Sequence, residues 1–350
     1  MTKDKLLEHI KNDETVADCT IENLELCEIE LSGVRFSNIS FVGVDFSSLK
    51  LLKIGFKDCS FSECVFDNAD FDGLFWNKMV LKRCSLKGAD MSESTFNGVD
   101  FSGCDFGGAN LTKTSFFEAV LNGVEFNNTE FAKTAFVKCE MKDSVFLDGD
   151  LVSVTFFKTD MQKTKFVNIN LKKCVLMDCV LVEQNFSNMK INMVQFNNSD
   201  LSGSDFGGAD ISKSNFIGCD LGSCKFNNAV ANNTIFTQAK LKSNDFTHAI
   251  LFQSNFENAY IVGSDFSDAD FQQTYFVSAN IKDTTLKGVN AKYANFSHAV
   301  FDNVYLMGAD FSHAMVHRAE FKNTNLTDAN CFAIKKTDKE LLEAEEFKYE

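Results

Sequence analysis

The sequence contains no proline, and this absence limits how its turns are built. A globular chain carries about 5% proline, much of it in loops. Trp and Tyr are also scarce, at 1 and 5 residues, whereas Phe and Cys are abundant, at 38 and 12. The chain must therefore make its turns without proline, and its apolar side chains are mainly phenylalanine.

Basic residues are outnumbered, and no long apolar run is present. The 34 Lys and Arg face 49 Asp and Glu, for a net charge of -15, which argues against unaided binding to nucleic-acid phosphates or anionic lipid heads. No stretch approaches the roughly 20 apolar residues of a membrane-spanning helix. Residues 1–15 are polar and lack the apolar segment of a signal peptide. We expect a cytoplasmic protein that binds neither nucleic acid nor membrane directly.

An apolar residue recurs at every fifth position. The series begins Val16, Ile21, Leu26, Leu31 and Phe36 and continues in frame to Cys331, through 64 consecutive units. We call this position the centre. Two residues before it lies a second series of mostly small residues, the small position, as in Cys59, Cys64 and Ala69. Residues two apart on an extended chain share a face, so both positions are predicted to point inward.

Gly and Asn concentrate two residues after the centre, as at Gly43, Gly73 and Asn128. These residues tolerate positive φ, which predicts one short strand and one tight corner in each unit. Corners in a stacked ladder need their backbone N–H groups as donors, and this need accounts for the missing proline.

Phenylalanine recurs with a ten-residue period. It fills 23 of the 32 centres whose numbers end in 6 but only 9 of the 32 that end in 1. A four-sided coil of 20 residues stacks Phe on Phe, as at Phe196, Phe216 and Phe236, whereas a three-sided coil would alternate Phe with Leu. The expected fold is an all-β, four-sided parallel β-helix of about 16 coils, about 77 Å long at the spacing of adjacent strands.

The repeat resembles that of the pentapeptide-repeat proteins. Their unit, a small residue, then Asp or Asn, then Leu or Phe, is matched by Ala109-Asn110-Leu111, Ala209-Asp210-Ile211 and Ala269-Asp270-Phe271. The resemblance implies a right-handed quadrilateral β-helix, in most members without a catalytic site. It also implies an alternative function, because some relatives are dimeric acidic DNA mimics that protect type II topoisomerases from quinolones. Relatives that do so with protruding loops break the five-residue frame, which here is unbroken.

Both ends of the repeat are predicted to carry helices. Residues 1–15 hold Leu6, Leu7 and Ile10 at helical spacing, which predicts an N-terminal capping helix before a β-helix over residues 16–333. Residues 334–350 are predicted to form a second amphipathic helix, with the segment from Thr337 to Glu340 as its capping box. That helix either covers the last coil or pairs with a second copy to form a homodimer. Its contact residues would be Leu341, Leu342 and Phe347.

No constellation of residues indicates catalysis or a cofactor. Ten of the 12 Cys occupy the small position, where buried free thiols pack as small apolar groups, and no Cys spacing matches a zinc motif. Four of the five His follow a centre by one or two positions and are expected to face solvent. Only His298 and His317 could meet across neighbouring coils, and the sequence shows no carboxylate beside them. We therefore expect neither an enzyme, nor a metal site, nor a cofactor.

Two outward surfaces are candidate binding sites. The acidic side is the one centred on Leu26, Phe46, Phe66 and their 20-residue successors, and it carries 12 acidic and 4 basic residues. Its candidate contact residues are Asp45, Asp105, Glu125, Asp205, Asp245 and Asp265. On the side centred on Phe36 and Phe56, the residue after the centre is apolar in four successive coils. These residues, the apolar column, are Phe117, Val137, Phe157 and Met177.

The two surfaces lead to two predicted functions. A contiguous apolar column is unusual on a soluble monomer, so we expect a non-enzymatic scaffold that binds a protein partner. The alternative is a DNA mimic that binds a type II topoisomerase such as gyrase through the acidic side. About 77 Å of B-DNA would carry roughly 45 charges, far more than the net of -8 on that side, so only a short DNA segment could be imitated.

Overall fold

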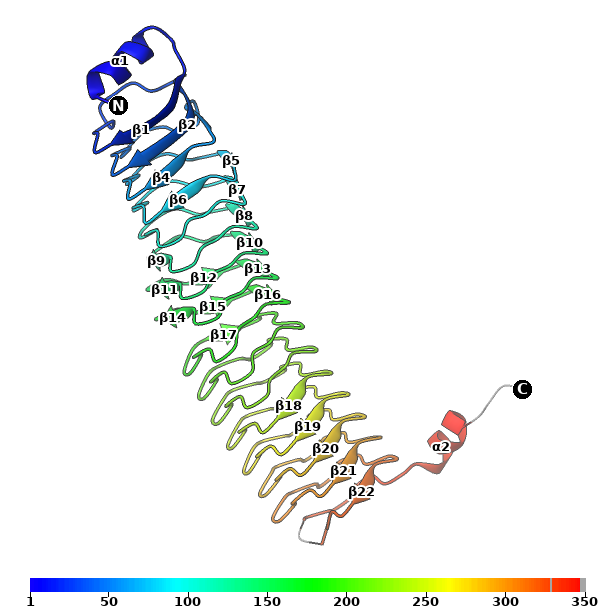
Figure 1. Ribbon diagram of the computed structural model, residues 1–350. Coiled ribbons are helices and arrows are strands. Elements are labelled where there is room, and N and C mark those ends of the chain that lie inside the picture. The colour runs from blue at the N-terminus through cyan, green and yellow to red at the C-terminus, as the bar shows by residue number, and fades with distance from the viewer. Residues whose placement is uncertain (328, 347–350) are drawn as a thin grey trace. The chain divides into compact units, whose positions relative to one another are not determined.

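The computed structural model describes residues 1–327 and 329–346. The chain forms two compact units, Met1–Asn170 and Leu171–Glu350. Within each unit the backbone winds in coils that are joined by parallel strand pairing (Figure 1). The two units together contain about 15 turns, close to the 16 expected. No helix within these residues is long and apolar enough to cross a membrane.

The first unit begins with helix α1 (Lys3–Lys11) and continues in short strands. These strands are β1 (Val16–Glu22), β2 (Arg35–Val42), β3 (Gly55–Lys57), β4 (Ser60–Ser62), β5 (Phe75–Asn77), β6 (Val80–Lys82), β7 (Thr95–Asn97), β8 (Ser115–Phe117), β9 (Glu125–Asn127), β10 (Ala135–Val137), β11 (Val145–Leu147), β12 (Leu151–Val152), β13 (Thr155–Phe157) and β14 (Lys165–Val167).

The second unit ends with helix α2 (Lys339–Glu346). Its strands are β15 (Leu171–Lys172), β16 (Val175–Met177), β17 (Ile191–Asn192), β18 (Lys240–Lys242), β19 (Tyr260–Val262), β20 (Asn280–Lys282), β21 (Val300–Asp302) and β22 (Glu320–Lys322). Elsewhere the coils are joined by isolated bridges, such as Asp245 with Asp265.

Strand pairing confirms the 20-residue register. In the first unit, β5, β7, β8, β10 and β13 pair in that order, and Phe136 lies between Phe116 and Phe156. In the second unit, β18 to β22 pair in sequence order, each 20 residues after the last. The pairing excludes a 15-residue coil, because Phe would then lie over Leu.

In most coils the core consists of the centres and the small positions, as the sequence predicted. In the second unit, Phe216 is fully buried, and its ring stacks on Phe196 at 4.9 Å and on Phe236 at 5.2 Å between ring centroids. Smaller residues such as Ala209 and Cys219 fill the corners around these rings. Contact between stacked aromatic rings is therefore the main packing interaction along the Phe columns.

Nearly every described corner places the residue two after the centre in the left-handed region; Glu28 and Lys53 are the exceptions. Gly43 has φ 61° and Asn128 has φ 50°, in line with the prediction. The Asn128 N–H donates to the Leu147 carbonyl of the next coil at 3.0 Å. Proline at this position would have neither the donor nor the required φ, and this explains its absence from the corners.

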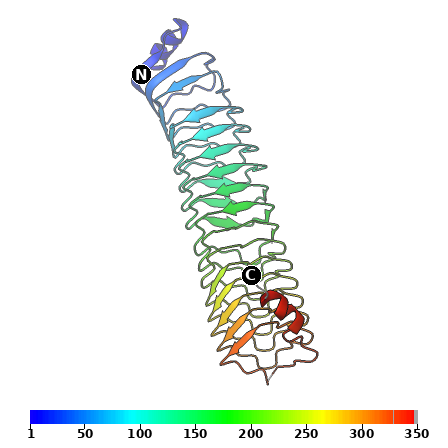
Figure 2. The same ribbon diagram turned by 90° about the vertical axis from the view of Figure 1, so that its right-hand side faces the viewer.

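The two ends are built differently. Leu6 of α1 is fully buried, and α1 lies against the first coil of the first unit (Figure 2). None of the described residues of α2 is buried, and the last centres of the second unit, Phe321, Leu326 and Cys331, stay partly exposed. The expectation that the C-terminal helix covers the last coil is therefore wrong.

The N-terminal cap of α2 also differs from the prediction. Asp338 is the cap, because its Oδ1 accepts hydrogen bonds from the N–H groups of Glu340 and Leu341 at 3.0 and 3.2 Å. Thr337 instead accepts the Arg318 N–H at 3.2 Å through its hydroxyl oxygen. A carboxylate caps a helix as well as a hydroxyl does, so the helix begins one residue later than the capping box implied.

Candidate interaction surfaces

The first unit holds three of the four residues of the apolar column, on neighbouring strands. Val137 on β10 is the register partner of both Phe117 on β8 and Phe157 on β13. Phe117 is 39% exposed, whereas Val137 and Phe157 are half-buried. The Lys158 ammonium lies 5.2 Å from the centre of the Phe157 ring. These side chains point outward but are partly covered, and the column spans about 10 Å at the spacing of adjacent strands.

Polar residues bound this part of the column on one side. At the equivalent position of the two preceding strands stand Asn77 and Asn97, joined by a side-chain hydrogen bond of 2.7 Å. Phe75, also on β5, is 67% exposed and was not singled out from the sequence, because it precedes its centre instead of following it. Met177, the fourth residue of the column, is half-buried on β16 of the second unit.

Aspartates of the acidic side have a structural task in the corners. Each of the five candidate aspartates precedes its centre and accepts the N–H group two residues later through Oδ1. The backbone N–H groups donate to Oδ1 in five pairs: Ser47 to Asp45 at 2.8 Å, Gly107 to Asp105 at 2.9 Å, Gly207 to Asp205 at 2.8 Å, Thr247 to Asp245 at 2.9 Å and Ser267 to Asp265 at 2.8 Å. These are Asx turns, in which a short carboxylate replaces a backbone acceptor.

Ion pairs neutralise part of the acidic side. In the first unit, Lys87 Nζ lies 3.0 Å from Asp105 Oδ2, and in the second unit Lys225 Nζ lies 3.5 Å from Asp205 Oδ2. Glu125 is exposed, on β9. Asp245 and Asp265 form a bridge between adjacent coils, so two carboxylates lie in register there.

The C-terminal helix is attached by its polar side. Glu345 lies 3.4 Å from His298, 3.3 Å from His317 and 3.1 Å from Arg318, measured between its carboxylate oxygens and their side-chain nitrogens. Leu341 is 47% exposed and Leu342 is half-exposed. Phe347 lies outside the described residues. We call the contact between Glu345, the two histidines and Arg318 the Glu345 clasp.

The clasp corrects two expectations. The sequence predicted that His317 faces solvent, yet only 2% of it is exposed. It also showed no carboxylate near His298 and His317, yet Glu345 meets both, 28 residues after His317. The two histidines do meet, with ring centroids 5.5 Å apart. A sequence pattern could not reveal Glu345, because its position depends on how the segment between the last coil and α2 folds back.

Hydrogen bonding decides what the clasp can hold. The Asp338 N–H donates to His317 Nδ1 at 3.1 Å, so the proton of the neutral ring lies on Nε2 and points at Glu345. A histidine that binds a metal ion through Nε2 needs that nitrogen free of a proton and donates the proton of Nδ1 to an acceptor. Desolvation raises the pKa of the Glu345 carboxyl, but hydrogen bonds from Arg318 and His317 outweigh it and hold this pKa below its usual range. The clasp is therefore suited to a hydrogen-bonded carboxylate and poorly suited to a metal ion.

The cysteines are free and mostly buried. Burial raises the pKa of the Cys139, Cys219 and Cys224 thiols to about 12. Cys84 and Cys104 lie in adjacent coils, and the Cys84 N–H donates to Cys104 Sγ at 3.4 Å. Protonated thiols in such surroundings are poor nucleophiles and poor metal ligands.

Two family models match the chain over most of its length. The model described as "Pentapeptide repeat region" matches residues 89–166 and 209–296. The model described as "Pentapeptide repeats (8 copies)" matches residues 59–98, 179–218 and 292–328. Together these ranges run from 59 to 166 and from 179 to 328. No curated protein is significantly similar in sequence.

Several solved structures are similar to the chain. One is HetL of the cyanobacterium Nostoc, a pentapeptide-repeat protein involved in regulating heterocyst differentiation, at 17% identity over 88% of this chain and 96% of HetL, with a TM-score of 0.17. Another is full-length QnrB1, a plasmid-mediated fluoroquinolone resistance protein, at 12% identity over 94% of this chain and 96% of QnrB1, with a TM-score of 0.16. Similarities at this level say nothing about what this chain binds.

Proposed function

Because the chain belongs to the pentapeptide-repeat proteins, we propose that it is a non-enzymatic scaffold that docks a protein partner on the apolar column. The observation that carries this proposal is the alignment of Phe117, Val137 and Phe157 on three paired strands. Their centres already fill the core, so these three side chains add nothing that the coil requires. An aromatic pair separated by one valine is a suitable anchor for an interface, where a few aromatic residues supply most of the binding energy.

The size of the column sets the size of the partner's contact. A strip of about 10 Å is too short for a complete interface, which buries about 800 Å² on each partner. The column would form the apolar centre of that contact, and polar residues such as Asn97 would form its rim. The partner should therefore present a single apolar projection and not a broad apolar face.

The experiment compares two double variants of the full chain as baits in lysate of the native host. Phe117→Ser with Phe157→Ser removes the aromatic anchors, whereas Asn77→Ser with Asn97→Ser changes the same position on two other strands of the sheet. We expect the parent and the asparagine variant to capture the same protein and the phenylalanine variant to lose it. Equal capture by all three baits would contradict the proposal. So would loss of folding in the phenylalanine variant, because these side chains would then belong to the core.

A second candidate function, DNA mimicry toward a type II topoisomerase, depends on the acidic side. What favours it is the pair Asp245 and Asp265, which lie in register on adjacent coils of the second unit. Because Oδ1 of each closes a corner, Asp→Lys variants would damage the fold and the charge together. Asp245→Asn with Asp265→Asn keeps the Oδ1 acceptor and removes only the charge. If the parent inhibits gyrase supercoiling and this variant does not, the candidate is supported. If the parent does not inhibit supercoiling at micromolar concentration, the DNA-mimic function is contradicted.

A further inference from the structure

The first two coils of the first unit are separated along one side, which we call the Leu31 side after its first centre. In the later coils of this side the ladder is closed: the Asp70 N–H donates to the Leu49 carbonyl at 2.8 Å, and the Leu51 N–H donates to the Asp70 carbonyl at 2.9 Å. The corresponding bonds one coil earlier are missing among the described residues. The N–H groups of Lys50 and Leu31 have no backbone acceptor there.

The ladder is also displaced by one residue where it resumes. The Gly33 N–H donates to the Lys53 carbonyl at 2.7 Å, whereas the corner register elsewhere would direct it to the Leu52 carbonyl. At the small position this part of the side has Ile29 and Leu49, both half-exposed, where the next coils have fully buried Ala69 and Ala89. Two large side chains thus line the gap between the coils instead of packing in the core.

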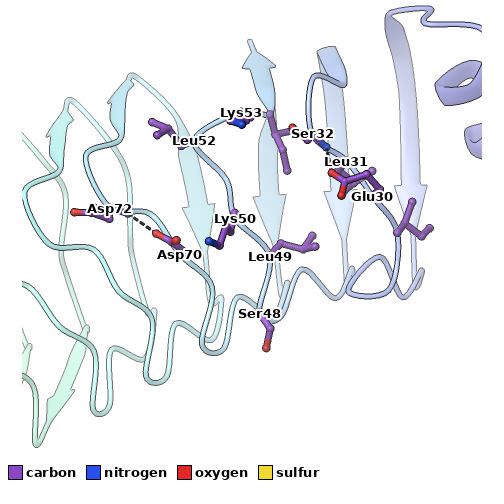
Figure 3. A pocket seen from close by; sticks show the side chains of 12 residues that line it. Glu30, Leu31, Ser32, Ser48, Leu49, Lys50, Leu52, Lys53, Asp70 and Asp72 are labelled. Carbon is purple, nitrogen blue, oxygen red and sulfur yellow. Dashed lines mark hydrogen bonds between the residues drawn. The ribbon is translucent and has the colours of Figure 1, made fainter.

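The gap forms a cleft of about 450 Å³, which we call the Leu49 cleft (Figure 3). Its apolar lining comes from Ile29, Leu31, Leu49, Leu52 and Ile54, and Leu52 is 63% exposed. Lys50, Lys53, Ser32 and Ser48 add polar groups from the same coils (Figure 3). A volume of this size is in the range of small-molecule sites, which are mostly apolar with a few placed polar groups.

The cleft contains cationic groups that have no ion-pair partner. Lys50 and Lys53 form no ion pair with any described residue, in contrast to lysines such as Lys113, whose ammonium lies 2.6 Å from Glu93. Three carboxylates also line the cleft, and each accepts a hydrogen bond: Glu30 from the Ser32 N–H at 2.9 Å, Asp70 from the Asp72 N–H at 3.0 Å and Asp72 from the Ser92 hydroxyl at 3.2 Å. Two ammonium groups and the amides of Leu31 and Lys50 therefore remain to bind an anion beside an apolar surface.

We propose that the Leu49 cleft binds a small carboxylic acid with an apolar chain, such as a medium-chain fatty acid. The carboxylate of the ligand accepts hydrogen bonds from the free backbone N–H groups and from Lys50 or Lys53. Such hydrogen bonds are charge-assisted and therefore strong. The apolar tail of the ligand lies on Ile29, Leu49 and Leu52 and removes these side chains from water. This site is separate from the apolar column, so it stands or falls independently of the proposed docking function.

The test is calorimetric titration of the full chain with octanoate, with 1-octanol as the uncharged probe and acetate as the probe without a chain. We expect one saturable octanoate site per chain, binding at least tenfold weaker for octanol, and no saturable binding of acetate. Lys50→Gln with Lys53→Gln should weaken octanoate binding at least tenfold and leave octanol binding unchanged. Lys78→Gln with Lys133→Gln, exposed lysines of the same unit outside the cleft, is the charge-matched control and should bind as the parent does.

A second variant tests the apolar part of the site. Ile29→Ala with Leu49→Ala introduces the residue found at this position in the next two coils, and it should abolish binding of both octanoate and octanol. Absence of saturable octanoate binding by the parent, binding at many weak sites, or undiminished binding by the lysine variant would each overturn the proposal. The lysine variant changes only exposed side chains, so the result does not depend on whether the alanine variant folds.

Discussion

At the scale of single residues, Phe216 shows how the register stabilises the core. Its ring lies between two rings of the same column, in contact with both. Phe216→Ala would leave a cavity that the stiff neighbouring coils cannot close, and we expect the free energy of unfolding to fall by about 3–5 kcal/mol. Thermal or urea unfolding measures this loss. Phe332→Ala is the control, since Phe332 is 69% exposed and its removal should change stability little.

The buried thiols predict a loss of stability at high pH. Cys139, Cys219 and Cys224 keep their protons to about pH 12 in the folded chain, whereas an unfolded thiol has a pKa near 9.0. Above pH 9 the unfolded state therefore binds fewer protons, and the free energy of unfolding falls as pH rises from 9 toward 12. Urea titrations at pH 8, 9, 10 and 11 measure the slope. Replacing these three residues with Ala should make the dependence shallower, and an unchanged slope would assign it to other groups.

Not every residue in a left-handed corner is of a type that favours positive φ. Gly43 and Asn128 could be placed in left-handed corners from their conformational freedom alone, yet Lys113 at φ 60° and Lys133 at φ 61° adopt the same conformation. The periodic frame, not the residue type, determines these corners, because the ladder on both sides requires an N–H at each one. Lysine accepts a strain of roughly 1–2 kcal/mol that glycine would avoid.

At the scale of elements, α2 is held mainly by one carboxylate. Glu345 contacts His298, His317 and Arg318, Glu346 adds a longer ion pair of 3.7 Å with Arg318, and neither leucine of the helix is buried. Glu345→Gln removes the charge, and we expect α2 to detach while the melting temperature of the coils hardly changes, since the helix buries nothing. Hydrogen exchange of residues 339–346 should then rise severalfold. Glu343→Gln, on the exposed part of the same helix, should leave exchange unchanged. Equal protection in both variants would show that the clasp does not hold α2.

The sequence could predict some features of the elements but not others. The repeat frame predicted the coil, the inward positions and a helix at each end, because each follows from local periodicity. The contact of Glu345 with His317 and the missing hydrogen bonds of the ladder at Leu49 depend on how neighbouring segments pack against each other. The periodicity of the sequence does not determine that packing. Ile29 and Leu49 did carry a signal, since they are large where Ala69 and Ala89 are small.

At the scale of the whole molecule, the exposed end of the second unit is where we expect two copies to associate. Val316, Phe321, Leu326, Cys331 and Ile334 line an apolar hollow there, and Leu341 is exposed on α2. A second copy would remove this surface from water. Light scattering should report a dimer for the parent and a monomer for Leu326→Ser with Leu341→Ser. Phe75→Ser, which alters an exposed apolar residue of the first unit, should remain dimeric. A monomeric parent at all concentrations would contradict this expectation.

The 20-residue register also determines which changes in gene length the fold can accept. Excising residues 201–220 from the second unit would join Asp200 to Leu221, and Leu221 would take the place of Leu201 with every later side chain still on its own side. Excising only five residues would turn all later coils by one side and set phenylalanine over leucine. Because each coil contacts only its neighbours, the cost of whole-coil loss stays local. Such a gene can lengthen or shorten by duplication or deletion of entire coils, while smaller steps disturb every column that follows.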